Sequence, residues 1–285
     1  MTPDAIELTD FGEAHLDGAL ALSREARWPH RREDWAMVLS LSQGIVALRD
    51  GAVVGTAMMT PFGTSATINL VIVATALRGH GLGRRLMDTA IGACGARVAR
   101  LIATPDGLPL YRKLGFRETH EIRQHQGIVL AAAEASATGA DRHGPLWAEE
   151  ADLAEIRTMD ATALGMDRSA LLSRIARDGR FAILRRDGKA AGYGAIRPFG
   201  RGEVAGPVVA DSEASARAIL RFLLDARPGA FLRVDTPAYP SLGPWLADRG
   251  LVEVDGGIAM RRGPEQPPPP ALPFQTFALA SQALG

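Results

Sequence analysis

The stretch Leu70-Val71-Ile72-Val73-Ala74-Thr75-Ala76-Leu77-Arg78-Gly79-His80-Gly81-Leu82-Gly83-Arg84-Arg85-Leu86-Met87 says most about how this chain folds. Four apolar β-forming residues come first, then a turn with glycine at three alternate positions, and then the start of an amphipathic helix. This pattern predicts a strand, a loop and a helix. Glycine lets the backbone approach a ligand closely, and the N–H groups at a helix start face it. We therefore expect this corner to bind an anion, above all a phosphate.

The composition indicates an ordinary globular protein and argues against several classes. The chain has 285 residues, of which 47% are hydrophobic, and its 32 basic residues balance its 32 acidic ones. That length allows two domains, and the zero net charge argues against a nucleic-acid binder. No apolar stretch approaches the roughly 20 residues that cross a bilayer, so we expect no membrane partner. The first residues also lack the pattern of a secretory signal. Because Cys94 is the only cysteine, we expect no metal site and a reducing, cytoplasmic setting.

The chain contains the same succession of elements twice. Asp50-Gly51 and Asp187-Gly188 each join two apolar runs, which predicts two β-hairpins because both turn residues tolerate positive φ. In each half a strand, a helix, another strand and a short helix ending at a glycine are predicted to follow. These lie at 68–74, 83–93, 98–103 and before Gly115 in the first half, and at 204–210, 214–225, 231–234 and before Gly250 in the second. Amphipathic helices at 32–42 and 167–178 precede the hairpins, so each half is predicted to be an α+β unit.

Changes in composition predict where the domains end. The small, polar stretch 134–145 is typical of a linker, and it separates a first domain at 1–133 from a second at 146–263. Residues 264–285 begin with a proline-rich spacer. The segment after the spacer is apolar again, and because disordered tails are rarely apolar, we expect it to fold back onto a domain.

The two halves differ at the glycine turn. None of the three glycines recurs in the second half, where Ile219 stands opposite Gly83. Asp211 and Glu213 place negative charge where an anion would lie. The second half therefore keeps the predicted architecture without the chemistry, and we expect one site per chain.

Two motifs together resemble those of the GNAT superfamily of N-acetyltransferases. The first is Val-x-x-x-x-Arg-Gly-x-Gly-x-Gly from Val73 to Gly83, and the second is Tyr-x-x-x-Gly-Phe from Tyr111 to Phe116. The resemblance covers roughly residues 1 to 130. The second half resembles a degenerate GNAT repeat, similar to the YitH/HolE-type acetyltransferase domain. The resemblance thus implies two GNAT-like domains of the α+β class, each with a mixed, largely antiparallel central sheet flanked by helices.

The resemblance implies acetyl-CoA as co-substrate. The strand residues Val71, Ile72 and Val73 would pair with its pantetheine arm. A loop that begins at Arg78 would hold the pyrophosphate through the backbone amides of Gly79, His80, Gly81, Leu82, Gly83 and Arg84. Tyr111 would donate a proton to the departing thiolate, which suits a phenol beside a leaving group with a pKa of about 8.5. A dinucleotide fingerprint, Gly-x-Gly-x-x-Gly, does not fit this glycine spacing, and a purely structural turn stays as an alternative.

The chain departs from the family pattern at two places. Many members have Asn seven residues before the tyrosine, whereas this chain has Thr104, whose hydroxyl is the candidate contact to the cofactor. Many members also carry a carboxylate on or beside the central strand as general base, and the strand Ile68–Val73 has none. The sequence therefore does not identify the base.

Five residues are candidates for the acceptor side. Trp28, His30 and Trp35 lie in a segment that borders the acceptor in this fold, and packing in the core is the alternative for Trp35. Asn69 is either a substrate contact or a satisfied buried amide. His125 is either a general base or a structural histidine. Tyr111 keeps a structural alternative as a core aromatic residue.

We therefore expect an enzyme, an N-acetyltransferase that acetylates an amine of a small molecule or a peptide by direct attack on the thioester. A non-catalytic protein that responds to acetyl-CoA is the alternative. The chain is expected to be a monomer or a homodimer. The sequence does not identify the acceptor or the role of the second domain.

Overall fold

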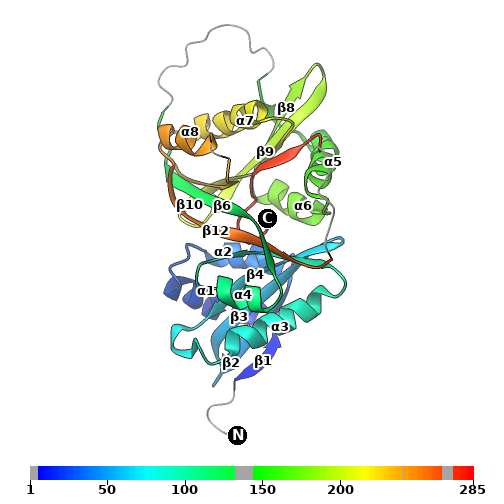
Figure 1. Cartoon of the computed structure of the whole chain (residues 1–285). Helices are drawn as coiled ribbons and strands as arrows, with labels where there is room; N and C mark the ends of the chain where they lie inside the picture. The colour runs from blue at the N-terminus through cyan, green and yellow to red at the C-terminus, as the bar shows by residue number, and fades with distance from the viewer. Residues whose placement is uncertain (1–5, 132–143, 240, 265–271) are drawn as a thin grey trace.

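The computed structural model describes residues 6–131, 144–239, 241–264 and 272–285. Residues 134–143 of the predicted linker and the prolines at 267–270 lie outside these ranges. Figure 1 shows the two halves of the chain one above the other, with the C-terminus between them. In the part of the chain that is described, no helix is both long enough and apolar enough to span a bilayer.

The first half follows the predicted order of elements. It consists of β1 (Glu7–Asp10), η1 (Glu13–His15), α1 (Leu16–Glu25), α2 (Arg32–Leu39), β2 (Gln43–Arg49), β3 (Ala52–Phe62), β4 (Ser65–Val73), η2 (Thr75–Leu77), α3 (Leu82–Cys94), β5 (Val98–Ala103), α4 (Leu108–Lys113) and β6 (Arg117–Ile128). The predicted hairpin turn is confirmed, because Asp50 and Gly51 have φ values of 51° and 78°. Positive φ at both turn residues matches the right-handed twist of the two strands.

The second half repeats that order. It consists of β7 (Leu146–Trp147), η3 (Glu150–Asp152), α5 (Leu153–Leu164), α6 (Ser169–Asp178), β8 (Arg180–Arg186), β9 (Lys189–Phe199), β10 (Gly202–Ala210), α7 (Glu213–Asp225), β11 (Phe231–Pro237), α8 (Leu242–Asp248), β12 (Val252–Arg262) and β13 (Gln275–Ala278). The second hairpin turn is confirmed as well, with φ values of 50° at Asp187 and 76° at Gly188.

The two halves exchange their last long strands, so that one sheet runs through the molecule. Its order is β1-β2-β3-β4-β5-β12-β6-β11-β10-β9-β8-β7, and β13 adds to β10. Strand β12 of the second half pairs with β5 of the first, while β6 of the first half pairs with β11 of the second. The β4–β5 and β10–β11 pairs are parallel and the other pairs antiparallel. The sheet is therefore mixed and largely antiparallel, as predicted, but it is continuous across both halves.

Strand β4 carries a bulge and then parts from β5. The register against β3 shifts between Thr56 and Met58, and Leu70 has a φ of 49°. A bulge bends its strand away from its neighbour. Accordingly β4 and β5 pair only over Ser65–Thr67 and Val98–Arg100, and their later residues separate. This separation opens the sheet in the first half.

The equivalent separation in the second half is filled by the C-terminal segment. Strands β10 and β11 pair only at Glu203–Val204, and β13 lies against β10 beyond that point. The Leu279 N–H donates to the Asp235 carbonyl of β11, at 2.8 Å. A Cβ added at Gly206 would lie 1.9 Å from the Leu279 carbonyl oxygen, so glycine is required for this close approach. The chain thus closes the gap in its second half with its own backbone.

Apolar side chains from both halves pack into a common core cluster. Trp35 and Phe62 of the first half belong to the same cluster as Ile156 and Leu171 of the second. Helices α3 and α7 each cover the hairpin strands of their own half through further apolar clusters. Because burial of apolar surface stabilises a fold, this shared cluster stabilises the packing of the two halves against each other.

Candidate active site

The glycine turn forms an open corner at the N-terminus of α3. Gly79 and Gly81 have φ values of 80° and 84°, and a Cβ added at either would meet nothing within 4 Å. Gly81 is the N-cap residue, and no side chain caps the helix there. The first N–H groups of an α-helix, here those of Leu82, Gly83 and Arg84, have no acceptor within the helix. The corner therefore presents N–H donors with space in front of them.

Packing within the chain does not demand glycine at position 83. A Cβ there would lie 3.5 Å from Leu110 Cδ2 and 3.7 Å from Val73 Cγ2, which are ordinary van der Waals distances. The φ of Gly83 is also not in the left-handed region. Its missing side chain leaves room for a group from outside the chain to approach the backbone. His80 and Arg84 are exposed beside it.

The N-terminus of α7, the equivalent helix in the second half, is closed by its own side chains. The Ser212 hydroxyl oxygen accepts a hydrogen bond from the Ser215 N–H at 3.2 Å. The Asp211 carboxylate accepts from the hydroxyls of both serines, at 2.9 Å and 2.5 Å. Ile219, which the sequence comparison sets opposite Gly83, is the seventh residue of α7 and is buried in the core; the residue at the position of Gly83 in the helix start is Ala214. The capping serines and the Asp211 carboxylate therefore make this helix start unfavourable for an anion.

Helix α4, which carries Tyr111, lies against the start of α3, since a Cβ added at Gly83 would lie 3.5 Å from Leu110 Cδ2. Arg78 Nη1 lies 3.5 Å from Asp106 Oδ2, which connects the loop before α4 to the glycine turn. The Tyr111 ring packs edge-on against Phe116 with 6.2 Å between centroids, and the side chain is 8% exposed. Burial raises the pKa of the Tyr111 phenol to about 12. The phenol therefore carries its proton at neutral pH.

Thr104 follows β5 and faces the separation of β4 and β5. Its carbonyl accepts from the N–H groups of Gly107 and Leu108, each at 3.0 Å, which starts α4. Its hydroxyl oxygen also lies 3.4 Å from the Gly107 nitrogen, as a weak acceptor. The residue lines a cavity that begins at the separated strands.

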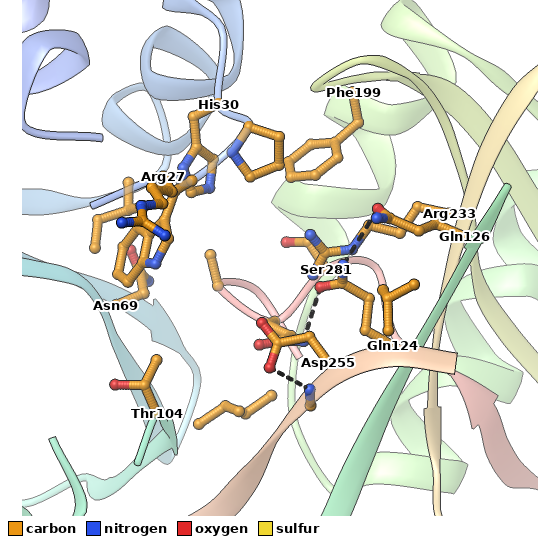
Figure 2. Close-up of a pocket in the computed structure, with 18 of the residues that line it drawn as sticks. Arg27, His30, Asn69, Thr104, Gln124, Gln126, Phe199, Arg233, Asp255 and Ser281 are labelled. Carbon is orange, nitrogen blue, oxygen red and sulfur yellow. Dashed lines mark hydrogen bonds between the residues drawn. The ribbon is translucent and has the colours of Figure 1, made fainter. Parts of the chain in front are cut away.

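This cavity measures about 280 Å³ and has walls from both halves of the chain. Figure 2 shows Asn69 and Thr104 on one wall, with Gln124, Gln126 and Arg233 on the opposite wall. The residues that line it are Arg27, Trp28, Pro29, His30, Ile68, Asn69, Leu70, Ile102, Thr104, Gln124, Gln126, Phe199, Arg201, Arg233, Val254, Asp255, Gly256, Ser281, Gln282 and Ala283. Its volume is near the lower end of the roughly 300–1,000 Å³ typical of small-molecule pockets.

His30 lies in the cavity wall as a neutral imidazole. Its ring makes edge contacts with Trp28 and Phe199, at centroid distances of 5.6 Å and 5.7 Å. Burial lowers the pKa of His30 to about 4; nearby Asp34 opposes this shift, and Arg233 adds to it. His30 therefore contributes hydrogen bonding rather than charge at neutral pH.

The structure separates the predicted acceptor residues into two groups. Trp28, His30 and Asn69 line the cavity. Trp35 is fully buried, stacks on Phe11 and donates a hydrogen bond from Nε1 to the Ser23 hydroxyl at 2.9 Å. This placement favours packing in the core as the role of Trp35. His125 lies between two cavity residues on β6, so its side chain points to the opposite face of the sheet.

On that opposite face His125 contacts α8 and Glu253. A Cβ added at Gly243 would lie 3.3 Å from His125 Nε2, and that nitrogen lies 4.0 Å from Glu253 Oε2. Burial lowers the pKa of His125, and Glu253 counteracts the shift. This placement favours the structural alternative for His125.

Sequence reasoning missed the residues that the second half contributes to the cavity. Phe199 stands out in the sequence only as part of a turn, and Arg233, Asp255 and the segment Ser281–Ala283 do not stand out at all. No local pattern marks them, because they come together only through the exchange of strands and the return of the C-terminal segment. The one sequence feature that includes any of them is the turn Pro198-Phe199-Gly200, which repeats Pro61-Phe62-Gly63 of the first half.

Comparison with known proteins finds acetyltransferases along the whole chain. Two family models described as "Acetyltransferase (GNAT) domain" match residues 40–118 and 156–271. The chain is 29% identical over 294 residues to the uncharacterized N-acetyltransferase YitH of Bacillus subtilis (strain 168), with 98% of each chain covered.

Solved structures share the fold. A putative acetyltransferase from Pyrococcus horikoshii superposes with a TM-score of 0.80 at 17% identity, covering 100% of this chain and 97% of the other. A tandem GNAT protein from the clavulanic acid biosynthesis pathway gives 0.67 at 15% identity, covering 92% and 100%. With a GNAT domain matched in each half, this chain belongs to the GNAT family of N-acetyltransferases, as an enzyme with two such domains in tandem.

Proposed function

We propose that the chain transfers the acetyl group of acetyl-CoA to a primary amine bound in the cavity, at one active site per chain. The observation that carries the proposal is the separation of β4 from β5 beside the uncapped N-terminus of α3. The open strand edge leads from the free helix N–H groups to Ile68, Asn69 and Leu70 of the same strand, which line the cavity. In the second half the helix start is capped and β13 fills the gap.

The residues of the first half fit the shape and charge of acetyl-CoA. Beyond Thr67, β4 has no β5 neighbour, so the backbone at Val71, Ile72 and Val73 has an edge with which a pantetheine amide can pair. The backbone from Gly79 to Arg84 would hold the pyrophosphate at the positive end of α3. Arg78 lies at the start of this corner, and Thr104 faces the separated strands.

Acetyl-CoA would supply an acetyl thioester, so that the products are an N-acetyl amine and the CoA thiol. Tyr111 donates a proton to the sulfur as the carbon–sulfur bond breaks. Its raised pKa keeps the phenol protonated, and general acid catalysis of this kind contributes typically 10²–10⁴-fold.

Asp255 acts at the amine. It is the one carboxylate among the described residues that line the cavity, and Figure 2 shows it between the two walls. Its Oδ1 accepts only from the Gly256 N–H among the described residues, at 2.8 Å. A carboxylate there can orient an ammonium group and accept its proton. In this proposal the general base is a residue of β12 in the second half and not of the central strand, which has no carboxylate.

The proposal is tested by titrating acetyl-CoA calorimetrically into the wild type, Gly83→Glu and Gly92→Glu. The Gly83→Glu substitution would place a carboxylate where the pyrophosphate should lie, without backbone strain and with only ordinary contacts at the new Cβ. Gly92 lies exposed on the same helix with nothing within 4 Å of an added Cβ, so it controls for the charge and the helix. We expect about one equivalent bound to the wild type and to Gly92→Glu, and none to Gly83→Glu.

Release of CoA thiol is then measured with primary amines as acceptors. Release that depends on both the amine and an intact Gly83 supports the enzyme. Two equivalents bound per chain would contradict the single site. Binding without thiol release for any amine would instead favour a protein that only binds acetyl-CoA.

A further inference from the structure

We propose that the acceptor is a primary amine that also carries an anion, a carboxylate or a phosphate, and that Arg201 and Arg233 bind this anion, while Arg27 adds to the positive charge of the cavity. This inference rests on the acetyl transfer proposed above and names its substrate class. All three arginines line the cavity. Arg27 comes from the first half and the other two from the second.

Arg233 is held in place before any ligand arrives. Its Nε lies 2.8 Å from Asp235 Oδ2 and its Nη2 2.9 Å from Asp235 Oδ1, and the residue is 8% exposed. Nη1 has no hydrogen-bond partner among the described residues. An oriented guanidinium loses little entropy when it binds a carboxylate or phosphate oxygen.

Arg27 and Arg201 supply charge that the chain does not neutralise. Both side chains are exposed, and neither has an ion-pair partner among the described residues. Arg201 lies over the Phe231 ring at 5.0 Å from its centroid. Because Asp235 offsets the charge of Arg233 and His30 is neutral, these two arginines give the cavity its positive excess over Asp255. That excess favours an anion and repels a polyamine.

The amine end of the acceptor would lie against Asn69 and Asp255. Asn69 is 6% exposed, and its Oδ1 has no hydrogen-bond partner among the described residues. Its Nδ2 donates to the Thr67 carbonyl at 3.3 Å and to the Thr60 hydroxyl at 3.0 Å, so the amide orientation is set. A buried carbonyl oxygen without a hydrogen-bond donor costs stability. An N–H group of the amine substrate would donate a hydrogen bond to it.

These groups define both ends of the acceptor. Asn69 lies on β4 where the strands separate, which is where the thioester must lie. Figure 2 shows Arg233 on the opposite wall from Asn69. Arg27 lies on the same side as Asn69, so the amine would lie at the strands and the anion toward Arg201 and Arg233, within one cavity of about 280 Å³.

The test measures thiol release from acetyl-CoA with matched acceptors. One arm pairs each of the common α-amino acids with its carboxamide. A second arm compares β-alanine, O-phosphoethanolamine and ethanolamine, so that a carboxylate, a phosphate and a neutral group are distinguished. The protein variants are Arg201→Gln, Arg27→Gln and, as a control, Arg221→Gln, which is exposed on α7 and does not line the cavity.

We expect turnover with at least one anion-bearing amine and at least tenfold lower kcat/KM with its neutral partner. Arg201→Gln should raise KM for that amine roughly tenfold, as the loss of a charge-assisted hydrogen bond does. Arg27→Gln removes only a more distant positive charge and should raise KM less. The KM of acetyl-CoA should not change, and Arg221→Gln should behave as the wild type.

Two results would overturn the inference. If the carboxamides or ethanolamine are acetylated as well as the acids, the chain is an acetyltransferase for which the anion is irrelevant. If no amine of either arm releases thiol although acetyl-CoA binds with one equivalent, the transfer reaction fails together with its acceptor class, and only the cofactor site stands.

Discussion

Arg233 and Asp235 lie two residues apart on β11 and form a two-pronged ion pair on one face of the strand. Asp235 is fully buried, and Gln282 Nε2 from the C-terminal segment lies 3.1 Å from its Oδ1. The Asp235 backbone carbonyl also accepts the N–H of Leu279. Asp235 therefore orients Arg233 in the cavity and also binds the C-terminal segment of the chain.

Asp235→Asn should lower the free energy of unfolding by about 3 kcal/mol, because it leaves Arg233 buried without its counter-charge. The change is measured by urea denaturation. The control is Asp17→Asn, whose partner Arg32 is exposed like Asp17 itself; exposed pairs contribute only about 0–1 kcal/mol. Equal losses in the two variants would contradict a special role for the buried pair.

Tyr111→Phe should lower kcat roughly 10²-fold while leaving the Kd of acetyl-CoA unchanged. The hydroxyl is lost, but the ring still packs against Phe116. Steady-state kinetics and calorimetric titration measure the two quantities separately. An unchanged kcat would show that Tyr111 is only a core aromatic residue. A loss of acetyl-CoA binding would instead indicate that the hydroxyl positions the cofactor.

His30 should make the protein less stable as the pH falls. Because the pKa is lowered from 6.5 to about 4 in the folded protein, the unfolded chain takes up a proton between these pH values that the folded chain does not. The contribution of His30 to the free energy of unfolding is therefore fully present above about pH 6.5. It decreases toward pH 4, by roughly 3 kcal/mol in all. Urea denaturation of the wild type and His30→Asn across this range isolates the contribution. Parallel pH profiles of the two proteins would refute it.

Gly206→Ala should destabilise the protein strongly, by about 2 kcal/mol or more, because its Cβ would collide with the Leu279 carbonyl oxygen. The matched control is Gly92→Ala, where an added Cβ meets nothing within 4 Å and helix propensity favours alanine. Thermal unfolding compares the two variants. A mild effect at position 206 would mean that β13 can leave the gap at little cost.

Local patterns in the sequence were sufficient to predict the elements and the conformation of the glycine turn. Asp-Gly between apolar runs predicts a hairpin because the turn needs positive φ at two adjacent residues, and both turns have it. The glycine turn likewise predicted the open start of α3, because φ at Gly79 and Gly81 and the lack of side chains are properties of the residues themselves. The loss of those glycines in the second half already distinguishes the two halves at the level of the sequence.

Only the tertiary structure decided which residues line the cavity. The exchange of β6 and β12 and the return of β13 bring residues such as Arg233, Asp255 and Gln282 to a site whose other wall is Asn69 and Thr104. Such contacts join residues far apart in the chain, and no short-range period or turn signal encodes them. The sequence by itself thus determined the elements and the open glycine turn, while strand pairing across the two halves decided which residues line the cavity, because pairing depends on the whole sheet and not on any one segment.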